Sequence, residues 1–118
     1  MSRARATALE SFWMGFVASL PCIVCARAGV GTTTYPIQVH HVAEGSGPTS
    51  NYAVVPLCEE HHDPNRTGSG FHGMGTRRFC QLFRVPGETE YGLFVWLAED
   101  IANYLKRRIG WSLYESKR

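Results

Sequence analysis

The sequence of 118 residues has little excess charge of either sign. It contains 12 lysine and arginine residues against 10 acidic ones, which leaves a formal net charge of +2. A strongly basic balance is the electrostatic mark of many nucleic-acid-binding chains, and it is missing here. The overall charge therefore permits DNA binding without arguing for it.

The sequence also lacks an apolar run long enough to cross a membrane. The longest one, residues 12–25, is interrupted by Pro21 and falls short of the ~18 residues that a spanning helix needs. A basic start and the small-residue triplet at 26–28 make a signal peptide the alternative. Cleavage there would remove Cys22 and Cys25, so we expect a cytoplasmic protein with no membrane contact.

No internal repeat or low-complexity tract divides the chain. Hydrophobic residues make up 44% of it and charged residues 19%, a composition typical of chains that fold. A length of 118 residues suits one domain and is too short for two well-buried cores. We therefore expect a single domain over residues 1–118, and a core this small gains from a structural metal.

Cysteines are few, and their spacing is informative. The even number allows disulfides, but Cys22 and Cys25 form a Cys-x-x-Cys pair and His61 follows Cys58 at the same spacing. This pattern favours zinc in a reducing compartment, because ordinary buried thiols have no reason to follow metal-ligand spacing. We predict a closed structural zinc site at Cys22, Cys25, Cys58 and His61. Cys80, in an apolar helical segment, is expected to be a core thiol.

Histidines are concentrated rather than scattered, since all five of them lie between residues 40 and 72. His61 belongs to the predicted zinc site, and His40, His41, His62 and His72 remain. With one of these reserved as a general base, three neutral imidazoles and an open position have the form of a catalytic metal site. A histidine doublet alone is usually structural. The second doublet after the Cys58 turn is what favours a site here.

The two doublets also carry a prediction about geometry. Neighbouring residues on a helix differ by about 100° in direction, so His61 and His62 can face different metals. Neighbouring residues on a strand point to opposite sides, so His40 and His41 should diverge. Both of them reach one phosphate only if the strand end is twisted or bulged.

The hydrophobic pattern predicts alternating helices, strands and turn-rich loops. Pro21 should end the first helix, and Pro86 with Gly87 should separate the last two. We expect helices at 7–20, 59–63, 76–85 and about 89–109, strands at 35–42 and 53–57, and loops at 22–34, 44–50 and 64–70. The last helix should bury a stripe formed by Leu93, Leu97, Ile101, Tyr104 and Leu105.

The motifs taken together resemble a known family. In chain order they are Leu20-Pro21-Cys22-x-x-Cys25, His40-His41-Val42, Val55-Pro56-Leu57-Cys58-x-x-His61-His62 and Gly70-Phe71-His72. This order, over about residues 18–84, is similar to the HNH nucleases, and most of all to the phage branch of RecA-dependent recombination-enhancement nucleases related to Ref. The resemblance implies an α+β fold with a small ββα-metal, or His-Me finger, core, a zinc-knuckle staple, and flanking helices at both ends.

The resemblance also implies roles for individual residues. His40 and His62 would ligate the catalytic metal, His72 would complete that shell from a loop, and His41 would be the general base. Asn51 is the nearest candidate for the middle Asn of the motif, which orients the base, although the usual position is closer to Ala53. The alternative for Asn51 is that it caps a turn.

These roles amount to a metal-dependent DNA endonuclease that hydrolyses phosphodiester bonds with a histidine base. A three-histidine shell favours Zn, Mn, Ni or Co over Mg, which prefers oxygen ligands. Arg66, Arg77, Arg78 and Arg84 follow the site and are candidates for phosphate contacts, with a solvated helix face as the equal alternative. The implied partners are DNA and a RecA filament, and no sequence signal fixes the oligomeric state.

Two other functions remain open at this point. One is a non-catalytic zinc module that binds DNA or a protein, which would keep the cysteine site and need none of His40, His41 and His62. The other is a nuclease that is inactive alone and cuts only RecA-coated DNA. Inactivity on naked DNA that is rescued by RecA-coated DNA would distinguish this nuclease from the binding module.

Overall fold

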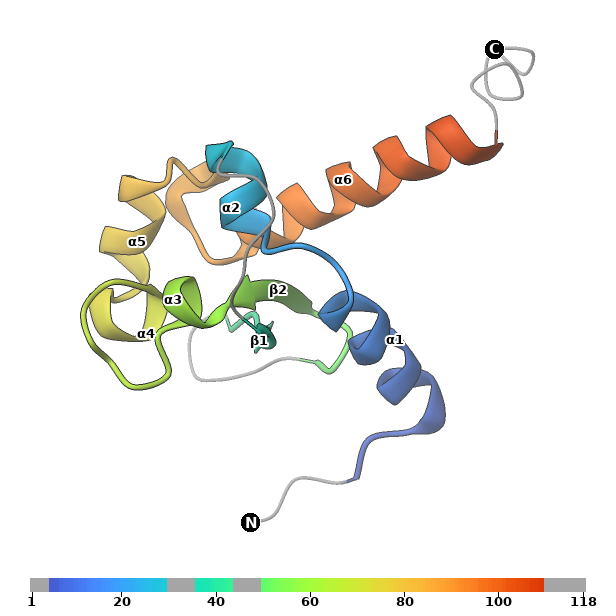
Figure 1. The fold of residues 1–118 in the computed structure, drawn as a ribbon, viewed down its shortest axis with the longest axis horizontal. Coiled ribbons are helices and arrows are strands. Elements are labelled where there is room, and N and C mark those ends of the chain that lie inside the picture. Colours follow the sequence, from blue (N-terminus) through green and yellow to red (C-terminus); the bar gives the residue numbers. More distant parts are fainter. Residues whose placement is uncertain (1–4, 30–35, 44–49, 110–118) are drawn as a thin grey trace.

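A two-stranded antiparallel sheet surrounded by short helices forms the centre of the computed structural model, which describes residues 5–29, 36–43 and 50–109. The described elements, in chain order, are α1 (Ala8–Ala18), α2 (Ile23–Ala28), β1 (Ile37–His41), β2 (Val54–Cys58), α3 (Glu59–His62), α4 (Phe71–Met74), α5 (Thr76–Leu82), the 3-10 turn η1 (Pro86–Glu88) and α6 (Tyr91–Ile109). Figure 1 shows helices at both ends of the chain around the sheet. The predicted α+β class is confirmed.

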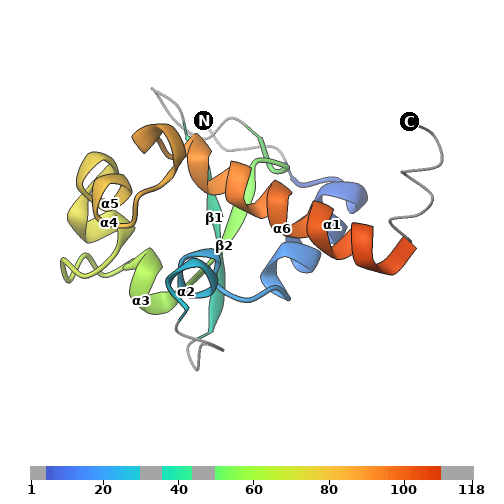
Figure 2. The same cartoon turned by 90° about the horizontal axis from the view of Figure 1, so that it is seen from above.

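The sheet pairs Ile37 with Cys58 at one end and His41 with Val54 at the other. Every residue of β2 is buried, because α1, α2, α3 and α6 all contact this strand. Figure 2 shows α6 passing across the sheet. Pro56 lies inside β2, which a two-stranded sheet tolerates because each strand has one unpaired edge. Most of the predicted loop 44–50 lies outside the described residues.

Helix α1 begins with a capping box in which the side chains of Thr7 and Glu10 each accept from the other's backbone N–H. It ends before Pro21, close to the predicted boundary. Its apolar residues are divided between the core and the surface: Val17 is buried and Trp13 packs against the core, whereas Phe12 is 72% exposed. The sequence pattern therefore located the helix, and only part of its apolar stripe packs.

Residues 23–28 form helix α2 where the sequence predicted a loop over 22–34, and residues 30–34 of that predicted loop lie outside the described residues. Cys22 caps α2 by accepting from the Cys25 N–H, and Gly29 ends it in the left-handed conformation. The stretch Ala8–Ala28 is long and apolar enough to span a membrane by length and composition, with a mean hydropathy of 1.6. The apolar segment is therefore longer than the run of residues 12–25 considered from the sequence. In the fold this stretch is split at Pro21 into α1 and α2, and Cys22 and Cys25 are buried in the core.

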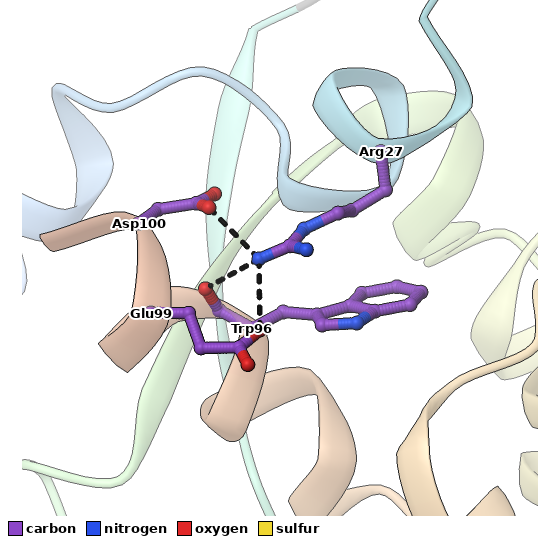
Figure 3. Close-up of polar contacts among 4 residues, drawn as sticks. All are labelled: Arg27, Trp96, Glu99 and Asp100. Atoms are coloured by element: carbon purple, nitrogen blue, oxygen red, sulfur yellow. Dashed lines mark hydrogen bonds and ion pairs between the residues drawn. The ribbon is translucent and has the colours of Figure 1, made fainter. Parts of the chain in front are cut away.

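Arg27 joins α2 to α6, as Figure 3 shows. Its guanidinium donates to the Trp96 carbonyl oxygen at 3.1 Å and forms ion pairs with Glu99 at 3.1 Å and Asp100 at 2.8 Å. The same guanidinium lies 5.3 Å from the centre of the Trp96 ring, within cation–π range. The contact covers part of Trp96 and joins this side of α6 to α2.

The buried stripe of α6 is confirmed in its first part. Leu93 and Leu97 are buried as predicted, and Ile101 is partly buried against the core, whereas Tyr104 is 51% and Leu105 is 45% exposed. Residues 102–109 are all exposed, and Figure 1 shows this half of the helix extending beyond the sheet. The sequence pattern thus predicted the helix correctly, but it predicted a longer buried stripe than the structure has.

Candidate metal centres

The first candidate centre brings together three buried thiols and one half-buried imidazole, from Cys22, Cys25, Cys58 and His61. The Nδ1 atom of His61 lies 3.5, 3.4 and 3.3 Å from the three Sγ atoms in chain order. The Sγ atoms of Cys25 and Cys58 are 3.9 Å apart. A tetrahedral zinc ion would hold such sulfur–nitrogen pairs about 3.5 Å and sulfur pairs about 3.8 Å apart. A disulfide needs about 2.05 Å, which this pair does not approach.

Local structure places these four ligand atoms. Cys22 and Cys25 stand at the cap and first turn of α2, and Cys58 and His61 stand at the cap and first turn of α3. Residues three apart on a helix share a face, so each pair points one way. Strand β2 delivers Cys58 to the first pair. The helical spacing that predicted this cluster from the sequence thus also brings its four ligand atoms together.

The charge balance of this cluster favours a cation. Burial, together with the neighbouring thiols of Cys22 and Cys58, raises the pKa of Cys25 to about 12, and burial also raises the pKa of Cys22. Burial lowers the pKa of His61, so its imidazole is neutral. A divalent cation reverses the preference of buried thiols for their protons. Three sulfur donors and one imidazole fit zinc.

The second candidate centre consists of His40 from β1, His62 from α3 and His72 from α4, each offering one nitrogen within 4.8 Å of the others. The Nε2 atoms of His62 and His72 are 3.0 Å apart. Two nitrogens bound to one metal at ~2.0–2.1 Å lie about 2.9–3.4 Å apart, so this pair fits. His72 was expected in a loop, and instead it lies on its own short helix, α4.

The imidazoles of His62 and His72 are held neutral. Burial and the adjacent His40 and His72 lower the pKa of His62 to about 4. Burial, His40 and the positive charge of Arg66 lower the pKa of His72. A neutral imidazole has the free lone pair that a metal requires. The cluster therefore suits a divalent cation better than it suits protons.

Two polar neighbours of this cluster had not been predicted from the sequence. The Oε1 atom of Gln38 lies 2.6 Å from His62 Nδ1, and because an amide oxygen only accepts, that nitrogen donates and Nε2 faces His72. The carboxylate of Glu90 lies 2.5 Å from His40 Nε2, and both side chains are nearly fully buried. Such partners orient metal-binding histidines. Gln38 shares a strand face with His40, a signal that was present, whereas Glu90 is distant in sequence.

His41 lies apart from this cluster and contacts Asn51. The Nε2 atom of His41 is 2.9 Å from Asn51 Oδ1, and Asn51 Nδ2 donates to Glu10 Oε2 at 3.3 Å. His40 and His41 nevertheless line the same pocket of about 740 Å³. The described β1–β2 pairing is continuous from Ile37 to His41, so no bulge in that ladder is involved.

The predicted phosphate-binding arginines lie at different distances from this pocket. Arg77 lines it, together with Glu88 and Thr89. Arg66 is near enough to affect His72. Arg78 is exposed on α5 and is not among the described residues that line the pocket, and Arg84 lines a separate one beside Arg27.

Asp63 organises the loop that carries the chain from His62 to His72. Its buried carboxylate accepts from the Thr67 N–H at 2.6 Å, the Thr67 hydroxyl at 2.8 Å, the Gly68 N–H at 2.8 Å and the Gly70 N–H at 3.3 Å. Burial alone would raise the pKa of Asp63, but these hydrogen bonds outweigh it and lower the pKa to about 2. The loop is thus tied to the end of α3.

Residues 6–97 match a family model described as "Recombination enhancement, RecA-dependent nuclease". The matched region contains both histidine and cysteine clusters, Asn51 and Glu90. Comparison with curated proteins and with solved structures gave no match.

Proposed function

Because the chain belongs to the family of RecA-dependent nucleases of recombination enhancement, we propose that it is a metal-dependent DNA endonuclease of the HNH type. The observation that carries this proposal is one pocket lined by three clustered imidazoles and by a fourth, His41, that is held separately. Three ligands and a separate base are the parts that metal-assisted phosphodiester hydrolysis requires.

His40, His62 and His72 would hold the catalytic metal. A divalent cation bound there supplies a positive charge for an oxygen of the scissile phosphate and for the departing 3′ oxygen. The imidazole set favours Zn, Mn, Ni or Co over Mg. Gln38 and Glu90 keep two of the rings in place, and Arg77 stands at the pocket wall for a neighbouring phosphate.

His41 would be the general base. The Asn51 oxygen can only accept, so His41 donates from Nε2 and its Nδ1 keeps a lone pair. That lone pair can take a proton from the attacking water, and imidazole is well matched to this work at neutral pH. The tetrahedral cluster of Cys22, Cys25, Cys58 and His61 has no open position and serves as a structural zinc staple.

The family description ties nuclease activity to RecA, and we propose that this chain acts on DNA in association with a RecA filament. Both of these lie inside the cell, so we propose an intracellular, cytoplasmic protein. The whole chain would act as one domain.

A plasmid-cleavage assay tests the proposal. The full chain, loaded with each divalent metal in turn, is given supercoiled DNA with and without RecA and a nucleotide that maintains the filament. We expect metal-dependent cutting, and His41→Ala should lower the rate by ~10²–10⁴-fold, the usual contribution of a general base. Gln81→Ala, at an exposed position on α5, is the matched control and should cut like the parent.

The arms of this assay separate the alternatives. Cutting that appears only with RecA identifies a filament-dependent nuclease. A parent protein that binds zinc but cuts neither form of DNA identifies a non-catalytic zinc module. A His41→Ala variant that cuts as fast as the parent shows that the base is another group.

A further inference from the structure

We propose that Glu10, on the N-terminal helix α1, is a positioning residue of the nuclease site. It fixes the amide of Asn51, and through that amide it fixes which nitrogen of His41 carries the proton. The proposal rests on the proposed role of His41 as general base, and it adds a residue that lies 31 positions earlier in the chain, outside the HNH motif.

Both oxygens of the Glu10 carboxylate are engaged. Oε1 accepts from the Thr7 backbone N–H at 2.7 Å, which is the reciprocal half of the helix capping box. Oε2 accepts from Asn51 Nδ2 at 3.3 Å. A capping box alone requires only the first of these contacts. The second one reaches out of the helix toward the pocket.

The segment that carries Asn51 is attached to α1 at a second point. The indole N–H of Trp13 donates to the Tyr52 carbonyl oxygen at 2.9 Å. Helix α1 also contacts both strands of the sheet. Glu10 and Trp13 are three residues apart and so lie on one face of the helix. The position of Asn51 relative to His41 is therefore set from α1.

The chemistry of the three groups permits one arrangement. A carboxylate only accepts, so the Asn51 amide must turn its NH₂ toward Glu10 and its oxygen toward His41. An amide oxygen also only accepts, so His41 must donate from Nε2. If the amide were reversed, its oxygen would face the carboxylate without a proton between them, and its NH₂ would require the lone pair of Nε2. His41 would then carry its proton on Nδ1, where the base needs a lone pair.

The variant Glu10→Gln reverses this arrangement while keeping the helix cap. The Thr7 N–H still needs an acceptor, so the new amide keeps its oxygen there and turns its NH₂ toward Asn51. Asn51 must then present its oxygen to that NH₂ and its own NH₂ to His41. Adding Asn51→Asp restores an acceptor that serves both neighbours. The double variant should therefore recover what the single variant loses.

The experiment measures DNA cleavage by the metal-loaded full chain and the His41 tautomer in the same proteins. Nitrogen-15 NMR above neutral pH, where imidazole is uncharged, distinguishes a proton on Nε2 from one on Nδ1. We expect Glu10→Gln to lower cleavage by roughly 10- to 100-fold, the range for partners that orient a ligand or base, and to move the proton to Nδ1. Glu10→Gln with Asn51→Asp should restore the proton to Nε2 and most of the rate.

Thr7→Ala is the matched structural control, because it removes the hydroxyl half of the capping box and leaves the backbone N–H that binds Glu10. It should lower the thermal midpoint of unfolding without changing the tautomer. Equal losses of cleavage in Thr7→Ala and Glu10→Gln, or an unchanged tautomer in Glu10→Gln, would overturn the proposal. The NMR readout needs no cleavage, so a protein that cuts nothing would sink the proposed function while Glu10 is still tested.

Discussion

At the scale of single residues, the hydrogen bonds of Asp63 stabilise one loop of the candidate site. One carboxylate accepts from three backbone N–H groups and a hydroxyl, and so ties together the loop between His62 and His72. These are charge-assisted hydrogen bonds, which are about twice as strong as neutral ones. The distance between His62 and His72 in the second candidate centre thus depends on Asp63, which belongs to neither cluster.

Asp63→Asn should destabilise the protein at neutral pH and much less in acid. The pKa of Asp63 is about 2 in the folded chain and has an ordinary value of 3.8. A lowered folded pKa gives stability that is present above the ordinary value and is lost as the pH falls through the folded one. Thermal unfolding of the zinc-loaded parent and variant at pH 7 checks the loss at neutral pH, and the series is extended toward acid only as far as both proteins keep their zinc. A variant with the parent's midpoint at pH 7 would contradict the prediction.

Single residues also show what sequence reasoning can reach. The cysteine cluster was predictable because its ligands follow helical spacing in two short turns. Gln38 lies two residues before His40 on the same strand face, so it could have been found from strand periodicity. Glu90 could not, since its contact with His40 joins residues 50 positions apart and depends on how η1 and α6 fold back.

At the scale of elements, helix α3 lies very close to the loop that follows it. A side chain at Gly70 would overlap the backbone carbonyl groups of Glu60 and His61. Gly70 is buried, and its own N–H is bound to Asp63. The absence of a side chain here lets the loop return close to the helix that carries His61 and His62.

Gly70→Ala should therefore displace α3 or the loop and cost about 1–3 kcal/mol of unfolding free energy, the usual range for overpacking. Affinity for metal at His62 and His72 should fall with it. Chemical denaturation and metal titration measure the two effects. Gly15→Ala, at a helical glycine with open space around it, is the control and should be neutral or slightly stabilising. Wild-type behaviour of Gly70→Ala would show that the close approach is not required.

Helices were harder to predict where tertiary packing determines their ends or their buried side. Helix α2 was missed because Gly29 and the polar residues after it suggested a loop, whereas capping by Cys22 allows one and a half turns before the chain leaves the helix. Helix α6 was found from its periodicity. Its buried stripe was predicted too long, because Leu93 and Leu97 are buried as expected whereas Tyr104 and Leu105 are exposed, which the pattern of α6 itself could not reveal.

At the scale of the whole molecule, the region that matches the family model ends at the last buried residue of α6. The last buried residue of α6 is Leu97, which is also the last residue matched by the family model. Beyond it the helix continues to Ile109 with every residue from 102 onward exposed. The region that matches the family model thus contains the sheet, its covering helices and the first part of α6.

Removal of the proposed structural zinc should unfold this region. Structural zinc contributes about 10–16 kcal/mol in small domains, which is comparable to the whole stability of a chain of this size. A strong chelator should lower the thermal midpoint by at least about 20 °C, since each kcal/mol is worth about 2–8 °C. Cys25→Ser should behave like the chelated protein. Cys80→Ala, at a buried thiol outside both clusters, should keep one tightly bound zinc per chain. Retention of the parent midpoint after chelation would show that the fold does not depend on metal.

Helix α3 is only four residues long, and it sends His61 to the cysteines and His62 to the other histidines. Two binding equilibria that share one rigid element are thermodynamically linked, and such linkage is reciprocal. Ordering α3 by zinc at the sulfur centre would prepare the neighbouring imidazole, and a cation in the histidine pocket would tighten zinc by the same factor. In the proposed nuclease the two metals would therefore load cooperatively, and the zinc-bound form would be the one that accepts the second ion.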